Sequence, residues 1–69
     1  MYWIIRTFHY GSDFVVQTHD GAEARRLQEE VRETQDFAID SEGDAYWPEV
    51  NVIEVLADGS TTLPEWERI

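Results

Sequence analysis

The sequence lacks cysteine and lysine altogether, and it contains no long apolar segment. Without cysteine there is no disulfide framework, no thiolate zinc site and no cysteine nucleophile. No apolar run approaches the ~20 residues of a membrane span, and the first residues lack the basic segment and apolar core of a secretory signal. These absences predict a cytoplasmic protein that does not associate with membranes.

Positive charge is scarce and unevenly placed. Fifteen acidic residues oppose five arginines, so the formal net charge is -10. Residues 1–32 carry five acids and four arginines, whereas residues 33–69 carry ten acids and Arg68 alone. This balance argues against direct binding to nucleic acid or to anionic membranes, because both need a positive surface. The asymmetry predicts an acidic interaction surface in the second half, although such a charge also keeps small proteins soluble and monomeric.

The length and the apolar pattern predict one small mixed domain, residues 1–69. The expected elements are a strand over 2–10, a turn at 11–13, a strand over 14–18, a helix over 21–34, a strand over 37–40, a turn at 41–44, a strand over 50–57, a turn at 58–59 and a short strand over 61–63. We therefore expect an α+β fold, an antiparallel β-sheet of four to five strands with one α-helix packed on one face, in ββαββ(β) order. The helix leaves the opposite sheet face uncovered, and we expect the acidic surface there.

The helix has a start signal and a narrow apolar stripe. Asp20, followed three residues later by Glu23, is similar to a capping box, in which the aspartate accepts hydrogen bonds from N–H groups of the first turn. Ala24, Leu27 and Val31 recur at helical spacing and predict the face that meets the sheet. The remaining arginine and glutamate side chains of the helix are spaced to pair with one another.

Few residues suit catalysis or metal binding. His9 falls in the first strand and His19 just before the helix cap, where surface and loop roles are usual. There is no Gly-rich phosphate loop, and the serines lie in turn contexts without a nucleophile motif. The acidic stretch 40–44 departs from the EF-hand order because Gly43 takes its fourth place. We therefore expect a protein that is not an enzyme and that holds no cofactor or metal.

The aromatic residues divide into core positions and candidate contacts. Four of them alternate along the chain as core residues do and are assigned to the core: Tyr2, Phe8, Phe14 and Phe37. Tyr46, Trp47 and Trp66 either cover the small core or anchor a partner, because tryptophan and tyrosine dominate binding hot spots. We favour the core for Trp47 and leave both interpretations open for Trp66; these two tryptophans are the candidate aromatic contacts.

Acids of the second half are the main candidates for binding a partner. The candidate set is Asp36, Asp40, Glu42, Asp44, Glu49, Glu54 and Asp58. The first four have even numbers, so an extended segment projects them from one face at intervals of ~6.5–7 Å. Phosphates along a nucleic-acid strand have a similar order of spacing, so such a row can compete for an arginine-rich groove. The turn at 41–44 limits this alternation.

Three stretches of the chain carry a family resemblance. They are the opening MYWIIRTFHYGSDFVVQTHDG, the single Arg/Glu helix, and the acid-only stretch through DAYWPEVNVIEVLADG. Over essentially its whole length the chain resembles the small, acidic, phage-encoded anti-CRISPR proteins, in particular the type I-C inhibitors. The resemblance assigns no binding residues; the acids above come from the charge pattern.

The resemblance implies a non-enzymatic inhibitor in the cytoplasm of an infected bacterium. Such an inhibitor binds Cascade, the crRNA-guided surveillance complex, and stops it engaging DNA, at the large subunit that reads the protospacer-adjacent motif (PAM). It competes with DNA without binding nucleic acid, and mutual repulsion at this charge favours a monomer. An alternative stays open: a small acidic protein–protein interaction module, either an antitoxin or an inhibitor of another DNA-binding or restriction enzyme, which contacts its partner through exposed aromatic residues.

Overall fold

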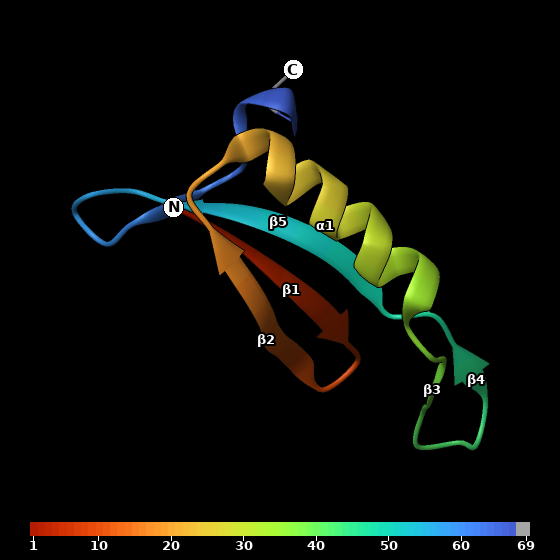
Figure 1. The fold of residues 1–69 in the computed structure, drawn as a ribbon. Helices are drawn as coiled ribbons and strands as arrows, with labels where there is room; N and C mark the ends of the chain where they lie inside the picture. The colour runs from red at the N-terminus through yellow and green to blue at the C-terminus, as the bar shows by residue number, and fades with distance from the viewer. Residues whose placement is uncertain (68–69) are drawn as a thin grey trace.

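The computed structural model describes residues 1–67, so Arg68, the one cation of the second half, lies outside the described residues. The elements in chain order are β1 (Tyr2–Phe8), β2 (Gly11–Thr18), α1 (Gly21–Thr34), β3 (Ala38–Ile39), β4 (Ala45–Tyr46), β5 (Glu49–Val55), β6 (Thr61–Thr62) and the short 3-10 helix η1 (Glu65–Glu67). Strands β2, β1, β5 and β6 form one antiparallel sheet in that order, and α1 lies across one of its faces (Figure 1). The expected α+β class and ββαββ(β) order are confirmed.

The first hairpin turns earlier than its sequence predicts. Phe8 pairs with Gly11, so the connection is the two-residue loop His9-Tyr10, and residues 11–13 belong to β2 rather than to a turn. Gly11 has a φ of 141°, a conformation that side-chain-bearing residues rarely adopt, which explains why a glycine stands there. A β-bulge between Ile4 and Ile5 then shifts the register of the two strands.

Helix α1 begins at the predicted cap. The Asp20 carboxylate accepts hydrogen bonds from the backbone N–H groups of Ala22 and Glu23. The Thr18 hydroxyl accepts from the backbone N–H of Asp20, so this cap is completed from the preceding strand. These bonds satisfy N–H groups that have no partner inside the helix, and they set where the helix starts.

The core is small and lies between α1 and the two central strands. Its fully buried apolar residues are Ile4, Ala24, Val50 and Val52, and the partly buried Tyr2, Val16, Leu27, Val31 and Trp66 pack around them. The predicted helix stripe is therefore the face that meets the sheet. Gln28 is also buried in this layer, because its side-chain amide donates a 2.9 Å hydrogen bond to the carbonyl of Val50.

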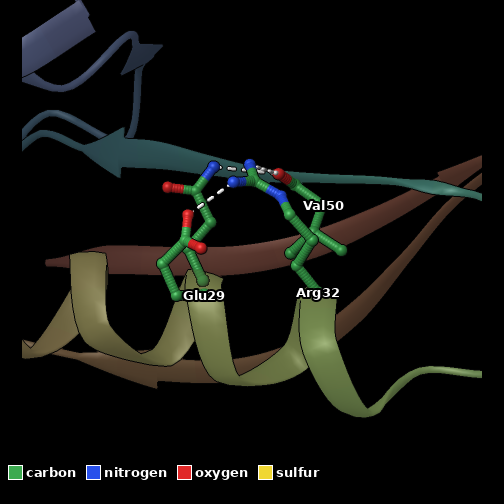
Figure 2. A network of polar contacts seen from close by, with 4 residues as sticks. Glu29, Arg32 and Val50 are labelled. Atoms are coloured by element: carbon green, nitrogen blue, oxygen red, sulfur yellow. Dashed lines mark hydrogen bonds and ion pairs between the residues drawn. The ribbon is translucent and has the colours of Figure 1, made fainter.

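Arg32 makes a second hydrogen bond between the helix and the sheet. Figure 2 shows its side chain extending from α1 toward β5, where it donates to the Val50 carbonyl while also pairing with Glu29. This guanidinium also lines one hollow with Trp47 and Glu49, but its ion pair within residues 1–67 is with Glu29.

A second, two-stranded sheet follows the helix. The expected strand over 37–40 is reduced to β3, and it pairs with β4 rather than with the main sheet. The predicted turn at 41–44 connects the two strands. β4 was not predicted, because two residues are too few for a recognisable alternation. Figure 1 shows this hairpin projecting beyond the C-terminal end of α1.

Candidate functional site

The uncovered face of the main sheet carries an apolar cluster, and of the seven candidate acids only Glu49, opposite Thr7, falls on it by register, so the expected acidic surface does not lie there. Strand register places Trp3 beside Ile53 and Ile5 beside Phe14 on the face away from α1. The rings of Trp3 and Phe14 meet edge-on at 5.7 Å, and Phe14 is 55% exposed. The assignment of Phe14 to the core is therefore wrong, because the single helix covers only the other face.

The acids gather instead on the acidic hairpin, which we define as residues 36–47. Asp36, Glu42 and Asp44 are exposed on it. Asp40 differs, because its Oδ1 accepts hydrogen bonds from the backbone N–H groups of Glu42 and Asp44, both at 2.9 Å. The extended backbone ends at Ile39, so the four carboxylates do not form the straight row that their numbering predicted: three point outward and one shapes the turn.

Within residues 1–67 no cation neutralises the carboxylates of the acidic hairpin. The ion pairs of this part of the chain join Arg26 to Glu30 and Arg32 to Glu29, and both lie within α1. Arg6 comes close, but it donates to the backbone carbonyl of Asp36 and to the side chain of Gln35. The negative charge of the hairpin is therefore uncompensated by the described residues.

The acidic hairpin is held firmly against the body of the protein. At its base the Gln35 side-chain amide donates to the carbonyl of Pro48, which is buried. Further along, the Tyr46 ring stacks on the His9 ring at 3.8 Å, and the Tyr46 hydroxyl accepts from the backbone N–H of His9. These contacts, at the base of the hairpin and from β4, fix the direction in which the carboxylates point.

The remaining candidate acids divide between the two ends of the molecule. Glu49 begins β5 next to the hairpin and is exposed. Glu54 lies near the other end of β5, half-buried opposite Tyr2, and Asp58 lies in the turn between β5 and β6. A seven-residue strand spans roughly 20 Å, and Figure 1 shows that turn at the end opposite the hairpin. The seven candidate acids therefore do not form one continuous surface.

Asp58 also has a local structural role. The Ser60 hydroxyl donates to its carboxylate at 2.6 Å and the Ser60 backbone N–H donates at 2.9 Å. These bonds favour the ionised form and lower the pKa of Asp58 below its ordinary value. Asp58 therefore stabilises its own turn, as an aspartate before glycine commonly does.

The two candidate tryptophans lie far apart and in different environments. Trp66 is half-buried in η1, where its ring lies 5.5 Å from the Tyr2 ring and under the guanidinium of Arg25. It therefore extends the core. Trp47, by contrast, is 66% exposed on the acidic hairpin, so the core assignment favoured for it is wrong.

Phe37 is a residue of this site that the sequence reading missed. It was assigned to the core, but it is 55% exposed, and its ring meets that of Trp47 edge-on at 6.2 Å. The sequence does contain a signal that Phe37 is exposed. It lies beside the acids of the second half, and no helix is predicted to cover it.

Residues 1–67 contain no group of three or more histidine or acidic side chains arranged to hold a metal ion. In the same part of the chain, no helix is both long and apolar enough to cross a membrane. Comparisons of the chain with protein-family models, curated proteins and solved structures find no match.

Proposed function

We propose that this protein is a non-enzymatic, anti-CRISPR inhibitor that binds the type I-C Cascade complex and blocks its recognition of the PAM in target DNA. The acidic hairpin, together with Glu49, occupies a basic groove of the large subunit in place of the DNA backbone. The protein acts as a monomer in the cytoplasm of the bacterial host cell and does not itself bind nucleic acid.

One observation carries this proposal: the outward carboxylates of Asp36, Glu42 and Asp44 have no cationic partner among residues 1–67 and are held on an anchored hairpin. A groove that binds phosphates already contains separated arginine and lysine side chains. A rigid set of anions satisfies those cations with little ordering cost. The net charge of -10 also steers the protein toward such a groove.

The exposure of Trp47 favours a second candidate function. An antitoxin, or an inhibitor of another DNA-binding or restriction enzyme, can present the same acids and use exposed aromatic side chains as its main contact. In that case purified Cascade does not bind the protein, whereas the alternative target does.

The test neutralises the outward acids of the hairpin. We expect the variant Asp36→Asn/Glu42→Gln/Asp44→Asn to displace PAM-containing duplex DNA from purified type I-C Cascade at least about 10-fold less well, because each exposed charge contact contributes about 0.5–1 kcal/mol. Asp40 is left unchanged because it shapes the turn. The measurement is DNA displacement at several salt concentrations, and the variant should also depend less on salt.

A matched control removes the same charge from the other end of the molecule. Glu23→Gln/Glu65→Gln/Glu67→Gln neutralises three exposed acids near the start of α1 and in η1. It should displace DNA within about twofold of the unchanged protein, because only long-range steering is altered. Equal loss in both variants, or no displacement by the unchanged protein, would contradict the proposal.

A further inference from the structure

The acidic hairpin also presents an apolar surface. Phe37, Ile39 and Trp47 are 55%, 57% and 66% exposed. Ile39 pairs with Ala45, so residues 37 and 39 of one arm and 45 and 47 of the other fall on the same side of the ladder. The contact between the rings of Phe37 and Trp47 agrees with this placement. We call Phe37, Ile39 and Trp47 the apolar hairpin face.

This face lies outside the core of the protein. The hydrogen bonds and ring contact that hold the hairpin come from Arg6, Gln35 and Tyr46, and the core cluster contains none of the three apolar side chains. Large apolar side chains grouped on a surface mark a protein interaction site, and tryptophan is the residue most enriched among binding hot spots. The apolar hairpin face is therefore available to a partner.

The surrounding charges identify what kind of partner fits. Asp36 precedes Phe37, Glu49 follows Trp47 by two residues, and Glu42 and Asp44 lie at the tip, all of them exposed. The complement of this arrangement is an apolar pocket bordered by arginine or lysine side chains. A second copy of the chain would bring the same acids face to face, and an anionic lipid surface would repel them. The partner is a basic protein.

We propose that the apolar hairpin face inserts into an apolar pocket beside the phosphate-binding cations of its target, and that it determines how long the complex lasts. This proposal rests on the proposed function, which names that target as the large subunit of Cascade. The acids then govern the rate of encounter, whereas Phe37 and Trp47 govern the rate of dissociation, because desolvated anchors act on release and exposed charges act on approach.

The division of roles can be measured with purified type I-C Cascade immobilised on a biosensor. We expect Phe37→Ser/Trp47→Ser to dissociate at least about 30-fold faster, the loss typical of hot-spot residues. Its association rate and the salt dependence of that rate should stay within about twofold of the unchanged protein. The variant Asp36→Asn/Glu42→Gln/Asp44→Asn, which we call the hairpin acid variant, should show the reverse, with slower association and a weaker salt dependence.

Phe14→Ser is the matched control, because Phe14 has the same exposed fraction as Phe37 but lies on the uncovered sheet face. It should dissociate at the unchanged rate. Each single variant, Phe37→Ser and Trp47→Ser, is measured separately with circular dichroism, so a folding defect in one leaves the other informative. Calorimetry should also show a less negative heat-capacity change of binding for the double variant.

The outcomes separate the two proposals. If the unchanged protein does not bind Cascade, the proposed function fails, and the assigned target of the apolar hairpin face fails with it. If the unchanged protein binds, the acid variant is weaker and the double serine variant dissociates normally, the proposed function stands and this inference is overturned. Faster dissociation of Phe14→Ser by the same factor would likewise overturn it, because the contact would then lie on the sheet face.

Discussion

Among single residues, Gln28 shows how a polar side chain can belong to the core. It is only 8% exposed, and its amide donates to the Val50 carbonyl across the helix–sheet interface. A buried hydrogen-bonding group stabilises a fold mainly because leaving its partner unsatisfied is costly. The same bond fixes the position of α1 along β5 and therefore the point from which the acidic hairpin projects.

We expect Gln28→Ala to lower the free energy of unfolding by about 1–3 kcal/mol, since it removes the donor and leaves a gap between helix and sheet. Chemical denaturation followed by circular dichroism measures the change. Gln17→Ala is the control, because Gln17 is exposed on β2, and its effect should stay within about 0.5 kcal/mol. Equal stabilities of the two variants would show that the Gln28 bond contributes nothing.

Asp40 illustrates why residue type alone does not define a contact residue. By charge it is equivalent to Asp36, Glu42 and Asp44, but its carboxylate is engaged by two backbone N–H groups of the turn. Aspartate commonly forms such turns, because its short side chain reaches the N–H groups that follow it. Its charge stays at the hairpin tip while its Oδ1 atom holds the backbone of Glu42 and Asp44 in place.

At the scale of elements, α1 is determined by local chemistry. Its start is set by the hydrogen bonds of the Asp20 cap, and its buried face by the spacing of Ala24, Leu27 and Val31. Arg26 pairs with Glu30 along the helix surface, Arg32 reaches the sheet as well as Glu29, and Arg25 lies over the Trp66 ring of η1. The helix therefore covers the core, and within residues 1–67 none of its arginines forms an ion pair with an acid of the hairpin.

We expect Asp20→Ala to destabilise the protein by about 1 kcal/mol, because two N–H groups of the first turn lose their acceptor. The control is Glu33→Ala, an exposed position in the last part of α1, where the change should stay within about 0.5 kcal/mol. Thermal unfolding compares the two. A cap variant as stable as the control would mean that tertiary packing alone sets the helix start.

The whole molecule is elongated, with extents of 40 × 23 × 23 Å. The core lies under α1, and the acidic hairpin extends beyond it at one end (Figure 1). This shape leaves the apolar hairpin face and the outward carboxylates exposed to solvent. It also leaves like charges close together within the hairpin, where they repel one another in the folded state.

We expect salt to stabilise the folded protein. Raising sodium chloride from about 0.02 M to about 0.5 M screens the repulsion between acids and should raise the midpoint of thermal unfolding by roughly 2–8 °C. The ion pairs of α1 are exposed. Because such pairs contribute only about 0–1 kcal/mol to stability, screening them with salt destabilises the protein little.

The hairpin acid variant provides the comparison for this measurement. It should unfold at a higher temperature than the unchanged protein in low salt and should respond less to added salt. A midpoint that stays constant or falls as salt rises would show that repulsion in the hairpin does not limit stability.

The sequence by itself determined those features that depend on neighbours along the chain. The helix bounds and the Asp20 cap follow from hydrogen bonds within a few residues, and the α+β class follows from periods of two and 3.6 residues. The shortage of positive charge after Arg32 is a property of composition, so it does not depend on how the chain folds.

Only the tertiary structure decided which faces are covered. Phe14, Phe37 and Trp47 resemble core residues by type, but burial depends on whether another element lies above them, and the single helix covers one face of one sheet. For the same reason the sequence gives the number of acids but does not determine where on the folded surface they lie. Glu49 and Asp58 are nine residues apart in the chain, and the extended strand β5 between them puts them at opposite ends of the main sheet.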